Sequence, residues 1–188
     1  MPTPVDLNIQ LDAIEGEANA QTKGALLEQL IGYLFGMLPG LTLDGEDVVN
    51  SFGSEEIDLI FWNEQLEGGL RFLDTPLILE CKGWSKPVAG REVRYFATEL
   101  KDKGRRNGIF VALNGITGNE ANLTAAFFHV AAAMIEGVQV LVLTGEELRN
   151  LQFAEDLVTI FRDKMLGMTR LQIRASKETE STAEPVAN

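Results

Sequence analysis

A short apolar run at residues 77–82 ends in Glu80-Cys81-Lys82 and constrains the fold more than any other part of the chain. The run is typical of a buried strand, where charged side chains are costly unless they are paired or bind a metal ion. Side chains alternate between the two faces of a strand, so Glu80 and Lys82 should project together while Cys81 points to the opposite face. We therefore expect a chemically special position at the end of a buried strand.

A second apolar run, at residues 56–62, carries an acid at Asp58. If the two runs are neighbouring strands, Asp58 and Glu80 bring carboxylate oxygens together as a compact site for a hard divalent cation. The chain has one cysteine and one histidine, which excludes a cysteine zinc site and favours Mg²⁺ or Mn²⁺. The alternative is a buried ion pair with Lys82 that performs no chemistry.

Composition limits the class of protein. A chain of 188 residues with 45% hydrophobic and 23% charged residues is typical of one globular domain. Its apolar stretches are too short to cross a bilayer, and the N-terminal sequence does not look like a secretory signal. A single cysteine excludes an internal disulfide framework. These features predict a cytoplasmic protein.

Charge is distributed unevenly along the chain. The net charge of −12 argues against indiscriminate binding to nucleic acid. Residues 1–80 hold 15 acids and 2 bases, whereas residues 81–106 hold 8 bases and 3 acids. A basic helix face next to the Glu80–Lys82 motif is a candidate surface for DNA phosphates. The alternative interpretation is a helix face that is only exposed to solvent. The candidate nucleic-acid-binding residues are Lys86, Arg91, Arg94 and Lys101.

The order of predicted elements favours an α/β fold, a three-layer α/β/α domain with a mixed central sheet. Capping-box spacings from Thr117 to Glu120 and from Thr144 to Glu147 predict the starts of two helices. The predicted elements are a helix at 22–38, strands at 47–52, 56–62 and 76–82, a helix at 90–103, a strand at 109–113, a helix at 117–136, a strand at 138–143 and a helix at 154–166.

The two ends of the chain are predicted to lie outside this domain, which covers residues 22–172. Apolar and polar residues alternate at 5–11, which predicts an edge strand or arm within residues 1–21. Residues 173–188 have too few apolar side chains to pack, and we expect a disordered tail.

The order of charged residues and elements resembles a known family. A helix bearing Glu28, a strand bearing Asp58, a strand ending in Glu-x-Lys at residues 80–82, and then a helix and a strand resemble the PD-(D/E)XK nuclease superfamily. Within that superfamily the chain is most similar to the Mrr-type restriction endonucleases, over about residues 22–143. The resemblance implies a restriction-endonuclease-like fold and an enzyme that hydrolyses DNA phosphodiesters with a divalent metal, as a restriction or anti-phage endonuclease.

The resemblance also implies roles for individual residues. Asp58, Glu80, the main-chain carbonyl of Cys81 and Glu28 are the implied ligands of Mg²⁺ or Mn²⁺. Lys82 is implied to orient the attacking water or to neutralise charge on the phosphate. The implied catalytic set is Asp58, Glu80, Lys82 and Glu28.

Three questions stay open at this point. The same fold is compatible with a catalytically silent module that binds nucleic acid or protein, and with an RNA-directed nuclease. No target-recognition domain is evident, so specificity should come from a recognition or delivery protein, from loops or from a homodimer, for which residues 5–11 are the candidate intersubunit strand. Trp84, beside the turn after the Glu80–Lys82 strand, is more typical of rim packing than of base stacking.

Overall fold

The computed structural model describes residues 4–49 and 56–182, with side chains described at 6–45 and 57–170. Within these ranges no helix combines the length and the apolar character needed to span a bilayer. The elements in chain order are α1 (Pro4–Gly16), α2 (Ala20–Gly36), β1 (Leu41–Val49), β2 (Glu56–Asn63), β3 (Leu77–Lys82), α3 (Gly90–Asp102), β4 (Asn107–Ala112), α4 (Ala126–Ile135), β5 (Gln139–Thr144), α5 (Gly145–Arg149) and α6 (Asp156–Thr182).

The strands form one mixed sheet in the order β1-β2-β3-β4-β5. The pairs β1–β2 and β2–β3 are antiparallel, whereas β3–β4 and β4–β5 are parallel. Parallel neighbours need a long crossover, and α3 and α4 supply the two crossovers here. β4 is buried along its whole length, as expected for a strand covered on both faces.

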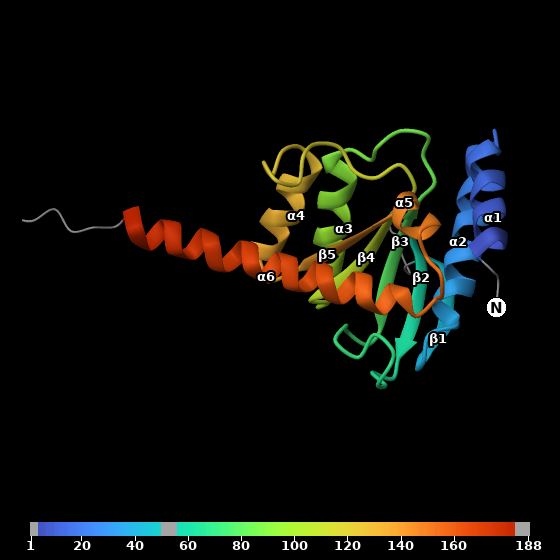
Figure 1. Ribbon diagram of the computed structural model, residues 1–188, viewed down its shortest axis with the longest axis horizontal. Helices are drawn as coiled ribbons and strands as arrows, with labels where there is room; N and C mark the ends of the chain where they lie inside the picture. The colour runs from blue at the N-terminus through green and yellow to red at the C-terminus, as the bar shows by residue number, and fades with distance from the viewer. Residues whose placement is uncertain (1–3, 50–55, 183–188) are drawn as a thin grey trace, which may run out of the picture.

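Helices cover both faces of the sheet. α3 and α4 pack on one face through an apolar cluster that includes Phe96 and Ala133. α1, α2 and α6 cover the other face through a second cluster that includes Leu11, Ile31 and Phe161. Figure 1 shows α3 beside α4, α1 beside α2, and α6 running past the rest of the domain. The prediction of a three-layer α/β/α fold with a mixed sheet is confirmed.

The N-terminal segment differs from the prediction, because residues 5–11 lie in helix α1 and not in a strand. Leu7, Leu11 and Ile14 are buried and follow helical spacing, while Ile9 is exposed. The apolar residues of this segment therefore fit both the period of a strand and the period of a helix, and packing against α2 selects the helix. The structure contradicts an intersubunit strand at residues 5–11.

The two capping-box predictions have different outcomes. The box from Thr144 to Glu147 forms and opens α5. The predicted helix at 117–136 begins only at Ala126, because a loop precedes it. Gly118 has a φ of +105°, which a right-handed helix cannot include, and Asn119 Oδ1 accepts a hydrogen bond from the amide of residue 122 within the loop.

Two predicted boundaries also change. β1 begins at Leu41, earlier than the predicted strand at 47–52, because it pairs with β2 as far as Asn63; residues 50–52 lie outside the described residues. α6 continues to Thr182, so a helix occupies most of the segment expected to be a disordered tail; its residues are mostly good helix formers. Residues 183–188 lie outside the described residues.

A buried polar network fixes the central strands at the end of the sheet away from the Glu80–Lys82 motif. Asn63 donates to the carbonyl oxygens of Leu70 and Leu73 at 2.9 and 3.2 Å. Asp74 donates its amide to Asn107 Oδ1 at 2.9 Å and accepts from the amide of Arg106 at 2.6 Å. These bonds tie the β2–β3 connection to the start of β4 and so fix the positions of the strands that carry the site.

Candidate active site

The end of the β2–β3 pair brings the two predicted acids together. Asp58 directly precedes Leu59 on β2, and Glu80 directly follows Leu79 on β3. Because Leu59 pairs with Leu79 and the two strands are antiparallel, both acids lie at the same end of the pair. Asp58 Oδ2 accepts a hydrogen bond from the backbone amide of Cys81 at 2.6 Å. A side chain thus continues the contact between β2 and β3 where the backbone pairing ends, and it fixes the Asp58 carboxylate beside the Glu-x-Lys motif.

Glu80 and Lys82 form an ion pair with each other, as their positions two residues apart on β3 allow. Their side chains are only 14% and 21% exposed. Burial of the Glu80 carboxyl and the charge of Asp58 raise its pKa from 4.5 to about 7, against the opposing effect of Lys82. Burial lowers the pKa of Lys82, but Glu80 and Asp58 more than offset this effect and the net pKa is raised. Lys82 therefore stays protonated, and the carboxylates of Asp58 and Glu80 share the single positive charge of its ammonium group.

Cys81 points to the opposite face of β3, as the alternation predicts, and its side chain lies in the core with α2. Burial raises the pKa of the thiol well above its usual value, and three nearby carboxylates raise it further. The thiol is consequently protonated at neutral pH, which argues against a nucleophilic role.

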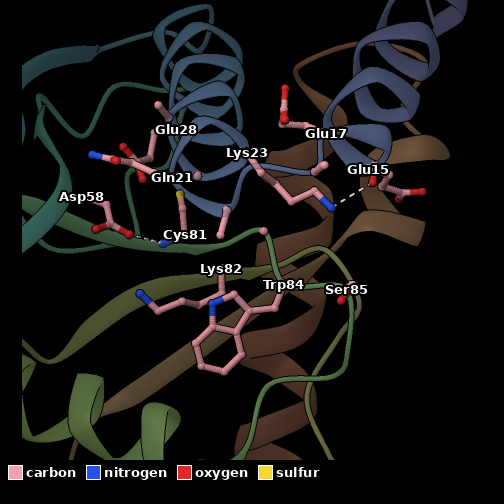
Figure 2. A pocket seen from close by; sticks show the side chains of 15 residues that line it. Glu15, Glu17, Gln21, Lys23, Glu28, Asp58, Cys81, Lys82, Trp84 and Ser85 are labelled. Atoms are coloured by element: carbon pink, nitrogen blue, oxygen red, sulfur yellow. Dashed lines mark hydrogen bonds between the residues drawn. The ribbon is translucent and has the colours of Figure 1, made fainter.

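Glu28 lies on the Cys81 side of β3. Gln21, Gly24, Ala25 and Glu28 line one pocket and recur at helical spacing on α2. Figure 2 shows Glu28 beside the Cys81 thiol and Lys82 on the other side of the strand. The structure therefore brings Glu28 to the same pocket as Asp58, but not to the Glu80–Lys82 ion pair.

Glu28, Asp58, Cys81 and Lys82 line a pocket of about 860 Å³ at the end of β3, whereas Glu80 is not among its lining residues. Asp58, Cys81 and Lys82 line one part, and residues 15–25, from the α1–α2 connection into α2, line another. Lys23 Nζ donates to the carbonyl oxygen of Glu15 at 2.9 Å within this second part (Figure 2). The volume is large enough for a nucleotide unit beside Asp58 and Lys82.

The donor atoms of this site suit a divalent cation of the Mg²⁺ type. Asp58 and Glu80 offer hard carboxylate oxygens, and their mutual repulsion, expressed in the raised pKa of Glu80, would be relieved by a positive ion. Among the described residues, no group of three or more His, Cys, Asp or Glu side chains is arranged to hold a metal ion. The fit of this site to a divalent cation therefore rests on the carboxylates of Asp58 and Glu80.

The predicted nucleic-acid-binding residues are all exposed, but they are not all brought to the site. Lys101 lies in the last turn of α3, which leads back to the start of β4 and so toward the end of the sheet away from the Glu80–Lys82 motif. Lys86 is exposed in the loop after β3, and Arg91 and Arg94 are exposed on α3. Arg91 pairs with Glu92 at 2.9 Å. Lys101 pairs with Glu136 of α4 at 2.6 Å, so part of its charge is already neutralised.

One acidic residue near the site was not predicted from the sequence. Glu99 of α3 is buried, pairs with Lys103 at 2.9 Å and contributes to the raised pKa of Glu80. Glu99 lies between Phe96 and Leu100 on the apolar face of the helix. An acid on an apolar helix face is the sequence pattern that could have identified it.

The comparison with protein families supports the class of protein that this fold and site define. A family model for the Mrr-type catalytic domain, described as "Restriction endonuclease", matches residues 20–151. The chain belongs to this restriction endonuclease family, which implies nuclease activity with DNA as substrate. Domains of this type generally use divalent metals. The match includes every predicted site residue, and no curated protein matches the sequence.

Proposed function

We propose that this protein is an endonuclease of restriction or anti-phage type that hydrolyses DNA phosphodiesters with Mg²⁺ or Mn²⁺. The observation that carries the proposal is the contact of Asp58 with the Cys81 amide at 2.6 Å, which joins the strand bearing the single acid to the strand bearing Glu-x-Lys. The raised pKa of Glu80 supports it, because a surplus of carboxylates over cations is what a metal-binding site requires.

In this proposal Asp58, Glu80 and the carbonyl of Cys81 hold the cation. A bound divalent cation supplies Lewis-acid activation of water and neutralises charge on the phosphate. Lys82 would donate hydrogen bonds to the attacking water or to a phosphate oxygen. It lines the same pocket as Asp58, and its ammonium stays charged. The water oxygen would bond to phosphorus and release a proton to solvent as the bond to the leaving oxygen breaks, and the leaving oxygen would take up a proton from solvent.

Glu28 has a more distant role in this scheme. It lies across β3 from Lys82 but lines the pocket with Asp58, where its carboxylate can hold a second cation or a water of the first one. Arg91, Arg94 and Lys86 then hold the DNA backbone without reading its sequence.

The test is a cleavage assay on supercoiled plasmid, linear DNA and RNA, each with Mg²⁺, with Mn²⁺ and with EDTA. Wild-type protein should cut DNA only with a divalent cation, and Asp58→Ala and Lys82→Ala should abolish cutting. Glu67→Gln, which changes an exposed acid away from the pocket, is the control for loss of charge. Cleavage of RNA alone would move the proposal to an RNA nuclease, and binding without any cleavage would indicate a silent module. Activity that survives both site substitutions would refute the assignment of residues.

Cutting both strands of a duplex is readily done by two active sites related by symmetry, so we propose that a second copy of the chain or a delivery protein takes part. Analytical ultracentrifugation with and without DNA measures the first option. A protein that remains monomeric on DNA and still makes double-strand breaks in a single binding event would contradict the need for a second copy.

A further inference from the structure

Trp84 is an aromatic side chain that the proposed chemistry leaves unused. It follows Lys82 by two residues, it is 45% exposed, and it lines the same pocket as Lys82 and Asp58. Figure 2 shows its indole ring on the same side of the strand as Lys82, away from α2. An indole that is 45% exposed and lines the pocket, instead of being packed into the core, leaves part of its surface accessible beside Lys82.

The backbone beneath this ring is fixed on both sides. Asn114 Nδ2 donates to the carbonyl oxygen of Trp84 at 2.7 Å, and the amide of Leu113 donates to the carbonyl oxygen of Lys82 at 3.2 Å. Gly83 between them is buried, and a Cβ there would lie 3.0 Å from Lys23 Cγ. These contacts hold in place the backbone that carries the ring, so a ligand does not have to order that backbone on binding.

The charge of the pocket selects which part of a nucleic acid can enter. Its lining contains four carboxylates and two ammonium groups: Glu15, Glu17, Glu28 and Lys23 on the α1–α2 side of β3, Asp58, and Lys82 on the side of the indole (Figure 2). Away from a bound cation, this surplus of negative charge repels a phosphate. An uncharged base beside the indole is not repelled.

We propose that Trp84 stacks on an unpaired DNA base next to the scissile phosphate, so that single-stranded or locally unpaired DNA binds more tightly than continuous duplex. A base that is paired within a duplex keeps both faces stacked on its neighbours and does not offer one to the indole. Stacking on aromatic side chains tolerates any base, so this contact selects DNA structure and not sequence. The inference rests on the proposed function for the position of the phosphate.

Tryptophan fluorescence tests the contact directly, because the chain contains two tryptophans and Trp62, exposed and outside the pocket, can be replaced. In the full-length Trp62→Phe protein, Trp84 is the sole tryptophan. A 12-nucleotide single strand should quench its emission at low salt with Ca²⁺ in place of Mg²⁺, and a blunt duplex of the same sequence should quench it much less. A single strand that binds, as seen by anisotropy of a labelled oligonucleotide, without changing the emission would overturn the proposal, and so would equal quenching by the duplex.

Substitution of the ring separates this inference from the nuclease proposal. Trp84→Ala should weaken single-strand binding by about 5- to 150-fold, Trp84→Phe should restore most of it, and Trp62→Ala should have no effect. If the wild-type protein cuts DNA with Mg²⁺ and Trp84→Ala keeps the wild-type ratio of single-strand to duplex cleavage, the base contact is refuted while the nuclease stands. If no DNA is cut but Trp84 is still quenched selectively by single strands, the base site stands and the nuclease proposal fails.

Discussion

Replacing Glu80 with glutamine should change how the stability of the metal-free protein depends on pH. Protonation of Glu80 stabilises the fold, because burial and Asp58 raise its pKa from 4.5 to about 7. That stabilisation is fully present below the unfolded pKa near 4.5 and is lost as the pH rises through about 7. A pKa difference of this size corresponds to about 3 kcal/mol, and the side chain is only 14% exposed, so solvent screening is small.

Urea unfolding in EDTA, followed by circular dichroism from pH 4.5 to 8, measures this effect. The amide in the Glu80→Gln variant stays neutral throughout, so the wild-type protein should lose about 3 kcal/mol relative to that variant across this range. Glu67→Gln, at an exposed position, controls for the loss of one negative charge. Adding Mg²⁺ at pH 8 should then stabilise the wild-type protein and not Glu80→Gln. Parallel pH profiles for wild type and Glu80→Gln would refute the reasoning.

Three further predictions concern the surroundings of the site. Thr144→Ala removes the cap of α5 and should lower the free energy of unfolding by about 1 kcal/mol in urea titration; an unchanged midpoint would contradict the capping role. Arg91→Ala and Arg94→Ala should each reduce the salt dependence of DNA binding by about one phosphate contact, and Lys101→Ala by less because of its ion pair; equal effects of all three would argue against this surface. Leu11→Ala should destabilise the protein by about 2–5 kcal/mol in the same urea assay, because this side chain of α1 is fully buried in the core; a neutral result would be inconsistent with a docked N-terminal helix.

The central part of the fold could be predicted because each of its sequence patterns fits only one type of secondary structure. The runs that became β2 and β3 are apolar with few charges, and the alternation on β3 places Glu80 and Lys82 together and Cys81 in the opposite core. The contact between Asp58 and the Cys81 amide could not be predicted, because it depends on the register between two strands that the sequence does not specify.

The ends of the chain and the region before α4 were predicted less well, for a physical reason. Residues 5–11 satisfy both a strand period and, with Ile14, a helix period, and only packing against α2 selects the helix. A capping-box spacing also needs helical backbone after it, which Gly118 with its positive φ does not provide. Glu99 was missed because its effect on Glu80 arises only when α3 packs on the sheet.

The central claim is that Asp58 and Glu80 hold the catalytic cation while Lys82 acts on the substrate. Electron paramagnetic resonance of Mn²⁺, titrated into wild-type protein and three variants at pH 8, tests it most directly. The claim predicts that wild type and Lys82→Ala bind Mn²⁺, whereas Asp58→Asn and Glu80→Gln bind it at least about tenfold more weakly. Mn²⁺ binding that is unchanged in both carboxylate variants would contradict the account.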